Sequence, residues 1–192
     1  NRTAPVIKLP AGASDDEHLG LIGVLNSSLA CFWMKQVSFN KGDSTDSSGA
    51  RTTGDAAFDT YEFTSTKVAQ FPIVDKLPVE IARRLDDQAR KRAALLPSEL
   101  LAVSAASAEC LPSRRSLDAA RTSLERVHRA MIAKQEELDW LCYREYGLLG
   151  DGGDAHCFEY LEPPEINFGE RAFEILLARR VAAGTETTTW FE

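Results

Sequence analysis

Apolar residues recur along much of the chain at steps of three and four, the spacing of one face of an α-helix. The first such stretch covers 15–37 and follows Ser14, an N-cap type of residue, with acidic residues in the first turn. Pro78 opens a second helix, expected over 79–96. A last helix is expected over 169–183. The pattern therefore predicts a chain dominated by helices.

The segment 116–146 has the clearest pattern, a repeat of seven residues. Two series of positions form it: Leu117, Leu124, Met131 and Leu138, and then Ala120, Val127, Lys134 and Leu141. Such a seam packs against another helix, so this segment and 79–96 predict a long antiparallel helical hairpin. We expect the large apolar seam residues to be mostly buried: Leu117, Leu124, Val127, Met131, Leu138 and Leu141.

Polar residues and glycines fill the stretch 38–60, which reads as a long loop. Residues 61–68 then alternate between apolar and polar, as in a strand. The predicted fold class is α+β and helix-dominated, with a small β element beside the hairpin. We divide the chain into a helix–loop–strand part over 1–75, the hairpin over 76–150, and an acidic tail with its helix over 151–192.

The charge is negative overall and unevenly distributed. The 192 residues include 22 basic and 29 acidic ones, a net charge of −7. A negative protein binds nucleic acid poorly through its overall field. However, residues 76–150 hold 13 basic and 11 acidic groups, and residues 151–192 hold 3 and 9. The net charge therefore does not exclude DNA contact by one face.

The four cysteines form no Cys-x-x-Cys pair, so we expect reduced, mostly buried thiols in a cytoplasmic protein. Cys142, His156 and Cys157 match no standard zinc spacing, and no metal is expected. The sequence contains no apolar run long enough to span a membrane and no signal peptide. Because the chain starts at Asn1 rather than Met, we expect it to be a piece of a longer protein.

No motif in the sequence supplies a catalytic site. The glycine-rich run 150–154 lacks the Lys and Ser/Thr of a phosphate-binding loop. The run 162–165, Glu-Pro-Pro-Glu, lacks the amide and the aromatic with which adenine methyltransferases hold a flipped base. The carboxylate pairs 86–87 and 136–137 are expected on exposed helix faces. An enzyme in its own right is therefore the least favoured interpretation.

The polar loop and its borders carry side chains suited to DNA contact: Lys35, Gln36, Asn40, Lys41, Arg51 and Lys67. Gln and Asn can pair with adenine, and Lys or Arg can pair with guanine or neutralise phosphate. Basic residues of the second helix could contact the DNA backbone or simply be solvated: Arg83, Arg84, Arg90, Lys91 and Arg92. A disordered polar loop without a ligand remains the alternative.

Several motifs resemble the C-terminal specificity region of large adenine-specific DNA methyltransferases. They are Leu25-Asn26-Ser27-Ser28, Phe32-Trp33-Met34-Lys35-Gln36, Tyr61-Glu62-Phe63 with Lys67, and Phe71-Pro72-Ile73. Two later runs, 136–148 and 169–180, look like the methyltransferases of BREX/Pgl phage-exclusion systems or of single-chain restriction–modification enzymes. The resemblance covers about 19–192, most of the chain.

This resemblance implies a parent protein with an N-terminal S-adenosylmethionine-dependent catalytic domain and a C-terminal target-recognition region. It implies no cofactor in the present chain, because no position matches the cofactor loop or the catalytic motif. The implied partners are duplex DNA and the missing catalytic domain, and recognition transfers to the polar loop and its borders. The competing interpretation is a protein-interaction module that docks subunits of a defence complex through the seam and the acidic tail.

Overall fold

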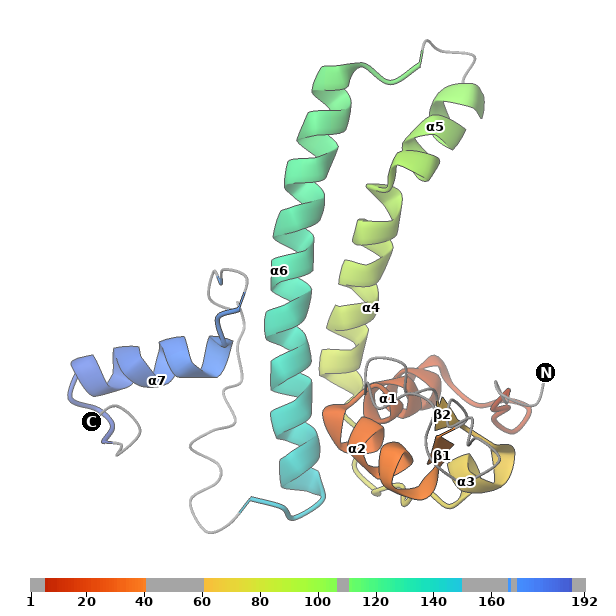
Figure 1. Cartoon of the computed structure of the whole chain (residues 1–192), viewed down its shortest axis with the longest axis vertical. Helices are drawn as coiled ribbons and strands as arrows, with labels where there is room; N and C mark the ends of the chain where they lie inside the picture. Colours follow the sequence, from red (N-terminus) through yellow and green to blue (C-terminus); the bar gives the residue numbers. More distant parts are fainter. Residues whose placement is uncertain (1–5, 41–60, 107–110, 150–165, 167–168, 188–192) are drawn as a thin grey trace, which may run out of the picture. The chain divides into compact units, whose positions relative to one another are not determined.

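The computed structural model describes residues 6–40, 61–106, 111–149, 166 and 169–187. It divides into two compact units, residues 1–77 and 78–192. Figure 1 labels the described helices, which are α1 Asp15–Leu25, α2 Ser28–Val37, α3 Ser65–Ala69, α4 Val79–Ala94, α5 Pro97–Ala106, α6 Arg114–Glu145 and α7 Ala172–Ala182. Two short strands, β1 Phe39–Asn40 and β2 Tyr61–Glu62, accompany them. The predicted dominance of helices is confirmed.

The helix expected over 15–37 is in fact two helices. Ser14 begins α1 as predicted, because its hydroxyl accepts from the Glu17 amide while the Glu17 carboxylate accepts from the Ser14 amide at 2.7 Å. These hydrogen bonds hold the pKa of the Glu17 carboxyl below its usual value. Ser27 then divides the stretch: it is fully buried, accepts from the Ala30 amide and donates to the Val24 carbonyl at 2.6 Å. A second cap inside the apolar pattern thus ends α1 and begins α2.

Replacing Ser27 by alanine is expected to lower the free energy of unfolding of the first unit by about 1–2 kcal/mol. The substitution removes the cap of α2 and leaves the Val24 carbonyl without its hydroxyl donor in a buried place. Chemical denaturation followed by circular dichroism measures the loss. Ser14→Ala is the matched control, since Ser14 caps α1 in solvent. Equal losses for the two variants would contradict a special role of the buried serine.

The strand expected over 61–68 is wrong beyond Glu62. β2 pairs antiparallel with β1, Phe39 opposite Glu62 and Asn40 opposite Tyr61. The Thr64 hydroxyl then accepts from the Lys67 amide at 3.4 Å and caps α3. The cap and the hydrogen bonds of one helical turn satisfy the backbone polar groups there. A longer β2 would have needed a longer partner strand for its backbone hydrogen bonds.

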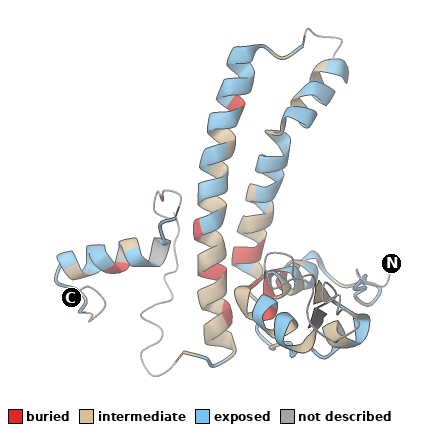
Figure 2. Cartoon of the chain, viewed as in Figure 1, coloured by how far each residue is buried: buried red, intermediate tan, exposed pale blue. Residues whose placement is uncertain are grey.

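The second unit is built on α6, which runs without interruption for 32 residues, as the repeat predicts. α4 lies beside it (Figure 1). Ile81, in the first turn of α4, packs against Leu138 and Cys142 near the end of α6. Leu85 and Leu141 pack around this buried cluster. In Figure 2 the buried residues of α4 and most of those of α6 lie toward the ends where these two helices meet.

Burial of the seam is confirmed at Leu138, which is 0% exposed, but is wrong at Leu117, which is 37% exposed. The other large seam residues are half-buried: Leu124, Val127, Met131 and Leu141. α4 ends at Ala94, and in α5, the shorter helix that follows it, no described residue is buried. The first half of α6 therefore has fewer apolar partners than an unbroken hairpin would provide.

α7 packs on α6 within the same unit, on the side opposite to α4 (Figure 1). Ala133 contacts Ile166 and Ile175, and Trp140 packs with Leu177 and Val181. The Arg171 guanidinium lies 3.6 Å from the Glu136 carboxylate, whose side chain is 10% exposed.

The expectation that the pair 136–137 is solvated is therefore wrong. Glu137 is 4% exposed, and Ala133, one turn before it, lies in the contact with the C-terminal segment. Cys142 is buried as expected, but Cys31 is exposed; both are free thiols. Cys110 and Cys157 lie outside the described residues. Within the described helices, none is long and apolar enough to cross a membrane.

Candidate nucleic-acid interface

The two ends of the polar loop are held side by side in the first unit. The last residue before 41–60, Asn40, stands opposite Tyr61 in the antiparallel ladder of β1 and β2. Residues 41–60 themselves lie outside the described part of the chain. The two described residues that flank this segment, Asn40 and Tyr61, therefore lie next to each other, close to the end of α2.

α2 exposes a face of mixed chemistry that leads into this ladder. Phe32, Lys35 and Gln36 are spaced at i, i+3 and i+4, so they lie on one side of the helix, and all three are exposed. Phe32 is 64% exposed, a large value for an aromatic side chain. One face thus offers an aromatic ring, an ammonium group and an amide together.

Aromatic rings of β2 and the residue after it extend this face. The Tyr61 and Phe63 rings stack at 6.4 Å between centroids with an interplanar angle of 7°. Residues two apart in an extended segment lie on the same side, which explains why these rings meet. The Lys35 Nζ lies 5.9 Å from the centroid of the Tyr61 ring, within the range of a cation–π contact. This contact places the Lys35 ammonium group beside β2, the strand that follows the polar segment.

Packing on the inner side holds α2 in position. The Trp33 ring meets the Phe71 ring edge-on at 5.4 Å, and Phe71 is buried. Ala30 and Ser27, on the same inner side, are also buried. Because these contacts fix the rotation of α2, its exposed side chains keep a defined orientation.

The structure brings some of the six predicted DNA-binding residues together. Lys35 and Gln36 are exposed on α2, and Asn40 stands in the ladder. Lys67 lies in the last turn of α3 and is half-buried. Lys41 and Arg51 lie outside the described residues. The role of all six in binding DNA stays a prediction.

Sequence reasoning did not propose Phe32, Tyr61 and Phe63 as site residues, although all three belong to the motifs quoted for the resemblance. The alternation of Tyr61 and Phe63 is a signal that could have grouped them on one side of the strand. Phe32 lies in the apolar pattern of its helix, so its exposure could not be read from spacing.

An apolar cleft of about 260 Å³ lies elsewhere in the first unit. Its walls come from the N-terminal segment, α1 and α3 with the residues after it: Val6, Ile7, Leu21, Leu25, Ser65, Val68, Ala69, Phe71 and Ile73. Val6 and Ile73 are largely exposed. No group of His, Cys, Asp or Glu side chains suited to a metal occurs among the residues that the structure describes.

Comparison with known proteins supports the resemblance read from the motifs. Over 195 aligned positions the chain is 45% identical to the adenine-specific methyltransferase PglX of Streptomyces coelicolor strain A3(2). The chain is similar over its whole length to the C-terminal part of that methyltransferase. The aligned region covers 100% of this chain and 16% of its relative. The predicted resemblance is confirmed.

A second similarity is confined to the end of the chain. Residues 131–192 match a family described as a domain of unknown function, DUF7008. In the structure this range begins in the second half of α6, at the level where Ala133 packs with Ile166 and Ile175. The family thus includes the part of α6 that α7 covers. No solved structure matches the chain.

Proposed function

We propose that this chain is the DNA target-recognition part of an adenine-specific DNA methyltransferase that acts in phage defence or restriction–modification. The observation that carries the proposal concerns the residues on either side of the polar segment 41–60. β1 and β2 pair there, beside the exposed face of α2. Similarity to the C-terminal part of a methyltransferase supports the same assignment.

The chemistry of the face suits the reading of duplex DNA. The Gln36 amide can donate to and accept from adenine in the major groove, and the Lys35 ammonium can donate to guanine or phosphate. Phe32 and Phe63, which are 64% and 37% exposed, can make apolar contact with a thymine methyl group or a sugar. An α-helix fits the major groove, so α2 and the loop together could present base contacts from a rigid support.

Methyl transfer belongs, in this proposal, to a catalytic domain elsewhere in a longer parent protein. That domain would bind S-adenosylmethionine, and we assign no residue of this chain to the cofactor. Duplex DNA and the catalytic domain are the partners, and the cytoplasm is the expected location. The present chain supplies the choice of sequence.

The runner-up function is a protein-interaction module that docks other subunits of a defence system. The apolar cleft favours it, since Val6, Ile7 and Ile73 expose apolar surface around a concave site. In that case DNA contact would be incidental, and the cleft rather than the α2 face would determine activity in the cell.

Exchange of the loop tests the proposal. We expect the intact protein, with residues 41–60 replaced by the corresponding segment of a relative with a different target, to methylate a different sequence. The ladder of β1 and β2 holds both ends of the segment, so the exchange should leave the first unit folded. Sequencing that detects N6-methyladenine reads the outcome across a whole genome.

Exchange of residues 97–106 in α5 is the control, because that helix lies in the other unit and should leave the methylated sequence unchanged. An unaltered target sequence in the loop variant, with its methylation rate intact, would count against the loop as the reader. The interaction module would then be the leading interpretation.

A further inference from the structure

The first half of α6 carries an exposed arginine face. Arg115, Arg126 and Arg129 lie on one side of the helix, because eleven residues complete about three turns and 129 follows 126 at i+3. All three are exposed, and they extend over roughly 21 Å of the helix at 1.5 Å per residue. We call these three residues the arginine face.

This face points away from the helix pair. Leu138, which packs against α4, follows Arg129 by nine residues, about two and a half turns, and so lies on the opposite side. Ala133 follows Arg129 by four residues and lies on the same side, where it contacts Ile166 and Ile175. On this side of α6, Ile166 and Ile175 pack at Ala133. The turns that precede Ala133 in the sequence are exposed there, and they carry the three arginines.

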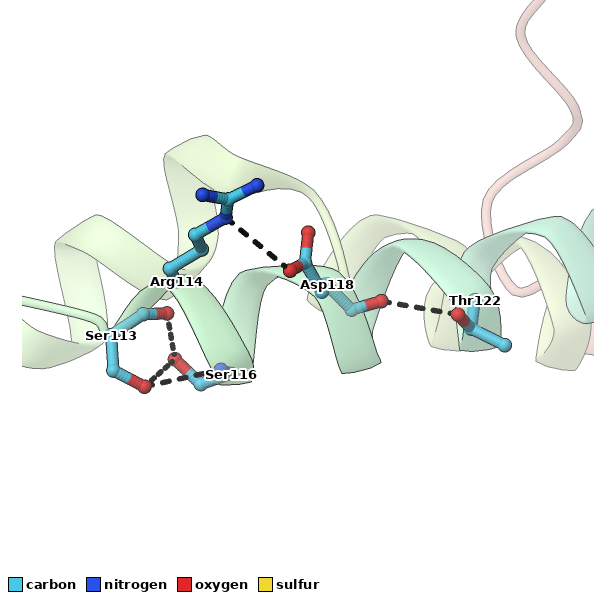
Figure 3. A network of polar contacts seen from close by, with 5 residues as sticks. All are labelled: Ser113, Arg114, Ser116, Asp118 and Thr122. Carbon is cyan, nitrogen blue, oxygen red and sulfur yellow. Dashed lines mark hydrogen bonds and ion pairs between the residues drawn. The ribbon is translucent and has the colours of Figure 1, made fainter.

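The nearby acids already have partners. Figure 3 shows the start of α6, where Arg114 Nε lies 3.8 Å from the Asp118 carboxylate. Arg121 pairs in the same way with Glu125 at 3.4 Å. Among the residues that the structure describes, the arginine face itself makes no ion pair. The two acids next to it are thus partly neutralised by other arginines.

Small side chains separate the charged groups. Ala119 and Thr122 lie between Arg115 and Arg126 on the same side, and both are exposed. The Thr122 hydroxyl is turned back to the Asp118 carbonyl, to which it donates at 3.1 Å (Figure 3). A bulky ligand can therefore approach the helix closely between the arginines.

Side-chain hydrogen bonds cap the N-terminus of α6. The Ser113 hydroxyl caps α6 by accepting from the Ser116 amide at 3.1 Å, and the Ser116 hydroxyl donates to the Ser113 carbonyl at 2.7 Å. The surroundings are basic as well, since residues 90–129 include eight basic and four acidic residues in a chain of net charge −7.

We propose that the arginine face of α6 binds the sugar–phosphate backbone of duplex DNA without regard to sequence. The fit is one of charge: spaced guanidinium groups suit a polyanion, whereas the face lacks the apolar centre that a protein interface usually has. This inference rests on the proposed function, because it takes DNA as the ligand. It adds a second contact surface, in the other unit, that holds the duplex while the loop reads it.

The test is the salt dependence of DNA binding by the intact protein. We expect the triple variant Arg115→Gln, Arg126→Gln, Arg129→Gln to lower affinity by the same factor for duplexes with and without the target sequence. The slope of log affinity against log salt should flatten by about 2.7, roughly 0.9 for each lost phosphate contact. Fluorescence anisotropy over a salt series measures both quantities.

The matched control removes three arginines whose charges are already paired: Arg114→Gln, Arg121→Gln and Arg144→Gln. It changes the net charge equally and should flatten the slope much less. Single variants, each expected to flatten the slope by about 0.9, replace the triple if its melting curve shows loss of folding. Replacement of all three by lysine should keep the slope.

Equal slopes for the test triple and the wild-type protein would overturn the proposal, as would equal effects of the test and control triples. Loss of binding to polyglutamate with DNA binding intact would assign the face to an acidic protein and would also overturn it. A loop exchange that leaves the methylated sequence unchanged, with a flattened slope in the triple variant, would reject the proposed function and keep this inference.

Discussion

Replacing Leu138 by alanine is expected to lower the free energy of unfolding of the second unit by about 2–5 kcal/mol. Leu138 is 0% exposed and packs with Ile81 and Cys142 where α4 meets α6. The substitution removes buried methyl groups and leaves a cavity between two helices whose backbones cannot close it completely. Denaturant titration followed by circular dichroism measures the loss.

Leu117→Ala is the matched control from the same heptad series. Leu117 is 37% exposed, so its truncation is expected to lower the free energy of unfolding by about 1 kcal/mol or less. Equal losses at the two positions would mean that the seam is equally buried along its length, for instance by a partner of the first half of α6. A loss below about 1 kcal/mol at Leu138 would contradict the buried cluster.

The double variant Lys35→Ala, Gln36→Ala is expected to weaken binding of the intact protein to its target duplex. Each side chain that contacts a base should contribute about 1–3 kcal/mol, and discrimination against mismatched sites should fall with the affinity. Both side chains are exposed on α2, so their removal leaves the packing of Trp33 on Phe71 intact. Competition binding against duplexes with single changes in the target measures affinity and discrimination together.

Gln70→Ala is the control for this variant, because Gln70 is an exposed amide in the same unit, at the end of α3. It should leave affinity and discrimination unchanged. If the double variant bound as the wild-type protein does, α2 would not be a reading helix. If affinity fell equally for every sequence, Lys35 would be a phosphate contact and Gln36 would carry no specificity.

Local signals in the sequence were sufficient for much of the helical structure. The heptad repeat predicted α6, and Pro78 and Ser14 marked where α4 and α1 begin. These features depend on residues within a few positions of one another, through caps, propensity and the period of the apolar face. The resemblance to methyltransferases likewise came from short runs of residues, and whole-length similarity confirmed it.

Contacts between distant segments decided the rest. The sequence predicts a solvated Glu137, yet it is 4% exposed, and the C-terminal segment packs on α6 one turn before it, at Ala133. Leu117 and Leu138 have the same place in the repeat, but α4 ends too early to cover the first. The meeting of Lys35 with Tyr61 follows from the pairing of β1 with β2. Periodicity determines which side of an element is apolar, whereas burial depends on which partner reaches that side, and only the tertiary structure determines that.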